Sequence, residues 1–180
     1  SSDVCSSDLD AVFNEFPKEF LEERGILELQ SRCDSKDTYL TRPDLGRRLC
    51  EDSANTLKGF YKKAPQVVVF ATDGLSGTAI EANYDIVIPA IMNGLKAHGI
   101  EAGEPFFVRY GRVACQDEVS EISGCDVCVC LVGERPGLAT AKSMSAYITY
   151  KGTIGMSAAV QWFQKDPCRI SICHAMNTCT

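Results

Sequence analysis

Apolar and polar residues alternate along the middle of this chain in blocks that predict strands and helices in turn. The segment 66–72 (QVVVFAT) is a nearly continuous, β-branched apolar run between a proline and Asp73-Gly74. Such a run, apolar on both faces, is typical of a central parallel strand that is covered by helices above and below. The segments 106–110 and 125–132 predict two further strands, and 147–150 predicts a fourth.

Helical periodicity fills the intervals between these runs. We expect Ser76 to cap a long helix that contains Pro89 and ends at Gly99, and we expect a short helix at 116–122. Strand, helix, strand, helix, strand is the order of an α/β domain. We therefore expect the α/β class: a Rossmann-like, three-layer domain with a mostly parallel sheet.

The part of the chain before this domain predicts helices only. Apolar residues between 9 and 24 follow helical spacing. Thr41 is a candidate N-cap of a second helix, with Pro43 in its first turn and an apolar face over 45–61. We expect a small helical N-terminal region at 10–64, preceded at 1–9 (SSDVCSSDL) by a non-native leader that resembles translated adapter sequence.

Composition and charge exclude several classes of protein. The 180 residues are 45% hydrophobic and 23% charged, which is typical of a globular protein rather than a disordered or fibrous one. No run approaches the ~18 consecutive apolar residues of a membrane span. The formal net charge of -6 argues against a nucleic-acid-binding surface. We therefore expect no nucleic acid and no membrane among the partners.

Ten cysteines raise two alternatives, a disulfide framework and a metal site. No secretory signal pattern is present, so we expect a cytosolic, reducing compartment in which disulfides are uncommon. Cys125 and Cys128 have zinc-knuckle spacing, but they lie in a strand pattern and no second Cys-x-x-Cys pair follows at a suitable distance. We favour burial of Cys128 and Cys130 in the core over metal binding.

Three glycine-containing loops follow the expected parallel strands, at 73–76, 111–113 and 133–137. The carboxyl ends of parallel strands meet at one edge of a sheet, and open α/β sheets bind their ligands there. Glycine lets the backbone approach a ligand closely. Turn formation alone explains any one of these loops, but three of them at one edge favour a binding site.

The loop residues do not by themselves define a reaction. Gly74-Leu75-Ser76-Gly77 is close to a nucleophile elbow, but the last glycine of that motif would fall at Thr78. Neither His98 nor His174 stands in a convincing position to serve a serine, so a serine-type hydrolase is the weaker alternative. Phosphate-binding glycine motifs are missing from the sequence. The residues alone leave an α/β domain with an unidentified ligand, and a stand-alone ligand-binding protein remains an alternative.

Four blocks of the sequence resemble the small (light) subunit of ethanolamine ammonia-lyase in their order and spacing. The first block runs from Ser31-Arg32-Cys33 to Leu49, and the others are Asp73-Gly74-Leu75-Ser76, Gly111-Arg112-Val113-Ala114 and Gly133-Glu134-Arg135-Pro136-Gly137-Leu138. The resemblance covers about residues 26–156. It implies an α/β cobalamin-binding domain at 65–156 and a divergent tail at 157–180, in which we assign no counterpart of the family's cobalamin-contacting cysteine.

The resemblance implies a non-autonomous subunit of an ammonia-lyase, which converts ethanolamine to acetaldehyde and ammonia by a radical mechanism with adenosylcobalamin. By motif, Val113 and Glu134 are the implied cobalamin contacts, while Asp73 and Ser76 are weaker candidates. No catalytic residue and no metal ligand is assigned to this chain. The implied partners are the large subunit, which holds ethanolamine, a reactivating chaperone and a microcompartment shell. The implied location is the cytoplasm, within a bacterial microcompartment.

Overall fold

A computed structural model describes residues 15–134, 143–155 and 169–172 of the chain. Within these ranges, strands from the whole described length form one six-stranded sheet in the order β1-β3-β2-β4-β5-β6. The strands are β1 (Leu27–Gln30), β2 (Val67–Thr72), β3 (Phe106–Arg109), β4 (Val127–Gly133), β5 (Met144–Tyr150) and β6 (Arg169–Ile172).

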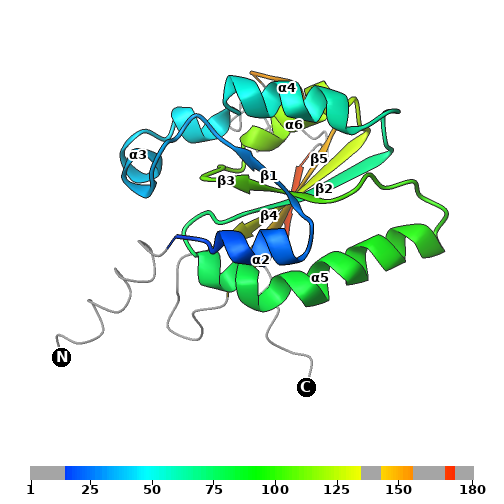
Figure 1. Cartoon of the computed structure of the whole chain (residues 1–180). Helices are drawn as coiled ribbons and strands as arrows, with labels where there is room; N and C mark the ends of the chain where they lie inside the picture. Colours follow the sequence, from blue (N-terminus) through cyan, green and yellow to red (C-terminus); the bar gives the residue numbers. More distant parts are fainter. Residues whose placement is uncertain (1–14, 135–142, 156–168, 173–180) are drawn as a thin grey trace.

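Helices cover both faces of this sheet (Figure 1). They are α2 (Lys18–Glu23), α3 (Lys36–Thr41), α4 (Glu51–Phe60), α5 (Gly77–Ala97) and α6 (Cys115–Ser123), with a 3-10 turn η1 (Leu45–Arg47). The helices α2 and α5 pack on one face, and α4 and α6 pack on the other. The expected α/β class is confirmed, whereas the finer Rossmann-like description and the division of the chain at residue 65 stay predictions.

The sheet is mostly parallel, as expected. The pairs β1–β3, β3–β2 and β2–β4 are parallel, and the pairs β4–β5 and β5–β6 are antiparallel. All six residues of β2 are buried, which its apolar run predicted. Because β2, β3 and β4 run in one direction, the loops that follow them meet at one side of the sheet. We call the residues 73–76, 110–113 and 133–134 the carboxyl edge.

Two hydrophobic clusters fill the space between the sheet and its helices. Beneath α2 and α5, Phe16 stacks on Phe107 with 4.6 Å between the ring centroids. Beneath α4 and α6, the cluster contains Phe70, Cys128 and Cys130. Both cysteines are fully buried, which confirms the prediction that they belong to the core.

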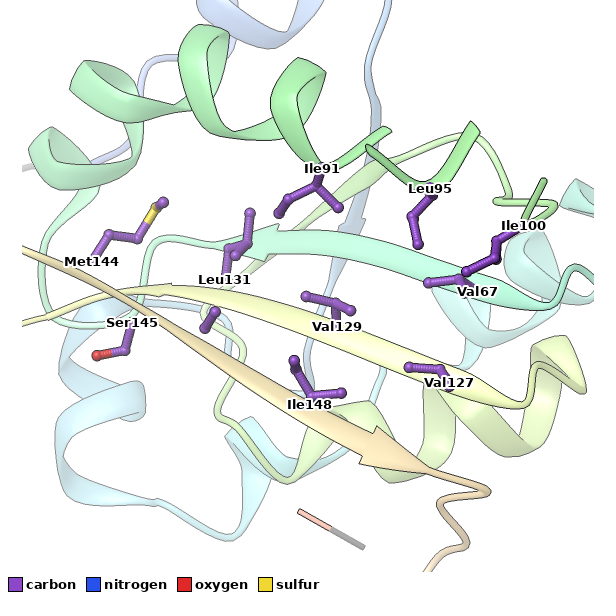
Figure 2. Close-up of a pocket in the computed structure, with 11 residues that line it drawn as sticks. Val67, Ile91, Leu95, Ile100, Val127, Val129, Leu131, Met144, Ser145 and Ile148 are labelled. Carbon is purple, nitrogen blue, oxygen red and sulfur yellow. The ribbon is translucent and has the colours of Figure 1, made fainter. Parts of the chain in front are cut away.

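An apolar cavity of about 490 Å³ lies where α5 passes over β4 and β5 (Figure 2). Ile91 and Leu95 point into it from α5, opposite side chains of the sheet. The lining includes Val67, Val127, Met144 and Ile148. We refer to α5 together with this cavity as the α5 flank. No helix in the described part of the chain is both long and apolar enough to span a membrane.

The elements before residue 65 differ from the sequence prediction. The segment 27–30 forms β1, a strand that was not predicted because four residues are too few to establish a period. Thr41 was expected to cap a helix, but it ends α3. The cap of α3 is Ser35, whose side chain accepts a hydrogen bond from the backbone N–H of Thr38 at 3.2 Å. The next helix, α4, begins only after Cys50.

The later elements follow the prediction closely. Ser76 caps α5 and accepts a hydrogen bond from the backbone N–H of Ala79 at 3.2 Å. Gly99, beyond the last turn of α5, has φ +71°. The short helix α6 covers the expected 116–122 with one more residue at each end. The last expected strand is longer than predicted, since β5 begins at Met144.

Candidate functional site: the carboxyl edge of the sheet

The loops after β2 and β4 are in direct backbone contact. Leu75 N donates to Gly133 O at 2.9 Å. A Cβ atom on Gly133 would lie 2.0 Å from Ser76 O, and one on Gly74 would lie 2.6 Å from Gly133 O. Gly74 also has φ +52°, in the left-handed region that favours glycine. These glycines are therefore required by the close packing of two loops on each other.

Asp73 and Thr72 connect the loop after β3 to the same turn. Asp73 Oδ1 accepts a hydrogen bond from Tyr110 N at 2.7 Å, and Tyr110 has φ +55°. Thr72 Oγ1 donates to Gly111 O at 3.1 Å and accepts from Gly111 N at 3.0 Å. Asp73 is 1% exposed, so its carboxylate faces these loops and not the solvent. The three loops that the sequence placed at one edge are brought together there.

Glu134 follows directly on β4 and is half-buried. Its Oε1 accepts a hydrogen bond from the Tyr147 hydroxyl at 3.1 Å, and its backbone N–H donates to Ser143 O at 3.0 Å. A carboxylate offers about four lone-pair sites, so it can accept further hydrogen bonds. Glu134 is thus an oriented acceptor at the end of a central strand.

Val113 lies on the loop between β3 and α6, and its partly buried side chain packs against the core beneath α4 and α6. Its neighbour Arg112 is tied to the segment around α3. Arg112 Nη2 donates to Tyr39 O at 2.6 Å, and the guanidinium carbon lies 4.4 Å from the centroid of the Tyr39 ring. Burial raises the pKa of Tyr39 to about 12, and Arg112 opposes this rise. The loop of Val113 is therefore anchored on both sides.

Gln116 is a polar residue of this region that the sequence reasoning missed. It lies in the first turn of α6 and is fully buried. Neither atom of its amide has a hydrogen-bond partner in the part of the chain that the structure describes, and the same holds for Arg112 Nε. Buried polar groups are nearly always paired. Two side chains that flank Val113 thus have unused hydrogen-bonding capacity, and nothing in the local sequence pattern predicted it.

The geometry does not support the serine hydrolase alternative. Ser76 is 1% exposed and its hydroxyl is occupied in capping α5. His98 lies at the opposite end of α5, and a helix of 21 residues is about 30 Å long. His174 and Arg135 lie outside the described residues. The carboxyl edge therefore presents binding groups, and its described residues do not include a paired nucleophile and base.

These features define an α/β protein whose candidate site is a binding surface made by three interlocked loops at the carboxyl edge. Comparison with known families is more specific. The chain belongs to the ethanolamine ammonia-lyase light chain family, whose model matches residues 6–163. The resemblance predicted from four sequence blocks is confirmed.

Curated relatives carry the same description. Over 150 residues the chain is 54% identical to the ethanolamine ammonia-lyase small subunit of Fusobacterium nucleatum, covering 83% of this chain and 51% of that protein. It is 50% identical over 147 residues to the protein of that name from Clostridium tetani, covering 82% and 50%. For the one from Clostridioides difficile, identity is 47% over 150 residues, covering 83% and 51%. The chain thus spans about half the length of the curated relatives it matches.

Proposed function

We propose that this chain provides the cobalamin-binding α/β part of an ethanolamine ammonia-lyase small subunit, with Val113 and Glu134 as contacts to adenosylcobalamin. The assembled enzyme, which needs a large subunit as its partner, converts ethanolamine to acetaldehyde and ammonia. The bound cofactor supplies the radical chemistry of that reaction. The observation that carries the proposal is the oriented carboxylate of Glu134 at the end of β4, on the edge where α/β sheets bind ligands.

The residues at the carboxyl edge fit a large ligand that bears amide groups. A carboxylate such as that of Glu134 only accepts hydrogen bonds, and amide N–H groups are its natural donors. Val113 is partly exposed and offers an apolar contact on the loop after β3. The carboxylate acceptor and the apolar side chain of this edge therefore suit the amide-lined periphery of a corrinoid.

The chain's own contribution is to bind, orient and exclude water. Tyr147 holds Glu134 through its hydroxyl, so the carboxylate meets the ligand in a fixed direction. Gly74 and Gly133 pack so closely that a Cβ atom on either would overlap the backbone of the other loop, so there is little room for water at this contact. Three loops are too small to enclose a corrinoid, so a second protein surface must shield radicals from solvent. A large subunit is the partner that would supply this surface.

The test is to replace Glu134 and measure cofactor affinity in the chain assembled with a cognate large subunit. Loss of a charge-assisted hydrogen bond should weaken binding by about 10- to 100-fold, equivalent to roughly 1.5–3 kcal/mol. We expect this for Glu134→Ala in an absorbance titration with hydroxocobalamin, and a smaller loss for Glu134→Gln, which keeps one acceptor oxygen.

The matched control is Glu81→Ala, which removes an exposed carboxylate from α5. It should leave both the titration and the thermal unfolding curve unchanged. Equal hydroxocobalamin affinity in the Glu134→Ala and parent complexes would contradict the assignment of Glu134.

A further inference from the structure

We propose that Lys36 and Asp73 form a buried ion pair that positions the loops of Val113 and Glu134, and that neither residue contacts the cofactor. They are positioning residues, and the part of this proposal that concerns cobalamin rests on the proposed function above. The proposal is based on a lysine that should not be buried and on a carboxylate that joins three separate segments of the chain.

Lys36 is the first residue of α3 and is only 5% exposed. Lysine is almost never fully buried unless it is paired. Its Nζ donates to Gly74 O at 2.6 Å, lies 3.8 Å from Asp73 Oδ2, and is 5.1 Å from the centroid of the Tyr39 ring. One ammonium group therefore fastens α3 to the turn that follows β2.

Asp73 continues the connection from that turn to the next loop. Its Oδ1 accepts from Tyr110 N at 2.7 Å, while its Oδ2 faces Lys36. Its backbone oxygen also accepts from Ser76 N at 2.9 Å, which closes the turn. The carboxylate of Asp73 thus contacts α3 and the loop after β3, and its backbone oxygen closes the loop after β2.

Both residues proposed as cofactor contacts are connected to this pair through a few hydrogen bonds and neighbouring residues. Gly74 O is held by Lys36, and the next residue, Leu75, donates its N–H to the oxygen of Gly133, which precedes Glu134. On the other side, Tyr110 adopts φ +55°, an unfavourable conformation for a residue with a side chain. The bond from Asp73 stabilises this conformation, which directs the chain toward Val113.

The electrostatics explain why the two charges belong together. Burial lowers the pKa of Lys36 and raises the pKa of Asp73, and each charge opposes the shift of the other. Arg109, which is paired with Glu28, also faces the cluster; it favours the charged form of Asp73 and disfavours that of Lys36. Removing one partner of a buried ion pair is more damaging than replacing both, because a lone buried charge remains.

This asymmetry separates positioning from direct contact. Lys36→Met leaves Asp73 without the counter-charge of Lys36, so the carboxylate should turn toward water and release the Tyr110 amide. Asp73→Asn leaves an acceptor for that amide but leaves the buried Lys36 ammonium without its carboxylate partner. The double variant K36M/D73N has neither charge and keeps an acceptor for the Tyr110 amide. It lacks the bond from Lys36 to Gly74 O, but the bond from Leu75 N to Gly133 O still holds that turn, so the loops should return close to their parental order.

The experiment measures these three variants in two ways. In the full chain, hydrogen exchange of the Tyr110 and Leu75 amides should be about 100-fold faster in Lys36→Met and close to parental in the double variant. In the complex with a large subunit, hydroxocobalamin affinity should fall about tenfold or more in each single variant and recover in the double variant. Leu57→Ala is the control. It removes a buried side chain of α4, far from the proposed contacts in the sequence, and should lower stability without changing the affinity of the folded protein.

Two results would overturn the proposal. One is parental amide protection and parental hydroxocobalamin affinity in Lys36→Met. The other is a double variant that binds as weakly as the single variants, because side chains in direct contact with the cofactor cannot be rescued by removing both. If the parental complex itself fails to bind hydroxocobalamin, the proposed function is wrong, and the exchange data still decide whether the pair orders the loops.

Discussion

The carboxyl edge and the α5 flank belong to the same sheet but are built on opposite principles. At the edge, backbone packs on backbone, and an added Cβ at Gly133 would lie 2.0 Å from a carbonyl oxygen. At the flank, side chains of α5 and the sheet leave a cavity of about 490 Å³ (Figure 2). The backbone conformation of the edge is therefore fixed by close contacts, whereas side chains at the flank have room to adjust. The proposed binding site thus lies where the backbone has no alternative arrangement, which suits loops that would hold a ligand in one geometry.

The sharpest test of this difference compares two glycines. Gly133→Ala adds one methyl group at the edge and should destabilise the fold by roughly 4 kcal/mol or more, because carbonyl groups of the backbone cannot yield as a flexible side chain can. Gly94→Ala adds the same group at an exposed position of α5, where nothing lies within 4 Å, and should stabilise the fold by about 0.5–1 kcal/mol. Urea denaturation of both variants gives the two free energies of unfolding.

The comparison would be broken if Gly133→Ala unfolded at a urea concentration near that of the parent. Such a result would mean that the turn at 73–76 moves freely. The carboxyl edge would then not be more rigid than the α5 flank.

A second test compares the two ends of α5 itself. Ile80 lies near the edge and is fully buried, so Ile80→Ala should cost about 3 kcal/mol, which includes the cavity it leaves. Leu95 is only partly buried and already borders the cavity, so Leu95→Ala should cost roughly 1 kcal/mol. Thermal unfolding monitored by circular dichroism would rank them. Equal losses would show that the flank is packed as tightly as the edge.

The sequence predicted best the elements whose signals are local. The apolar run of β2 and the Ser76 cap of α5 each need only a few neighbouring residues to form, and both are confirmed. The strand β1 was missed because Leu27–Gln30 is too short to show a period. It is recognisable only from its parallel pairing with β3, about 80 residues further along the chain.

The candidate site was predictable in its position but not in its internal connections. The three loops follow from strand order, and Val113 and Glu134 follow from the family resemblance. Lys36 stands in the largely polar and charged segment 31–38, a composition that by itself indicates exposure. It is buried because it meets Asp73 and Gly74, far away in the sequence. Gln116 lies in an amphipathic helix, where a polar residue is expected on the outer face. Tertiary contacts decide both cases, and no local pattern encodes them.

The smallest expected effect comes from an ion pair on the outside of the α5 flank. Arg24 donates to both carboxylate oxygens of Asp85, at 2.8 and 2.7 Å, and joins α2 to α5. The Asp85 side chain is 58% exposed, so solvent screens the pair. Asp85→Asn should therefore lower stability less than any of the destabilising variants above, in contrast to the loss of one partner from the buried pair of Lys36 and Asp73.

The pH dependence of this exposed pair gives its own check. The hydrogen bond from Arg24 lowers the pKa of Asp85. A carboxylate with a lowered folded-state pKa stabilises the fold above its ordinary pKa of ~3.9, and this contribution is lost as the pH falls through the lowered value. The difference between Asp85→Asn and the parent in urea denaturation should thus be small at neutral pH and should vanish in acid. A difference that persisted after Asp85 was protonated would mean that the side chain acts through packing rather than charge, and that the two regions differ less in their electrostatics than their burial indicates.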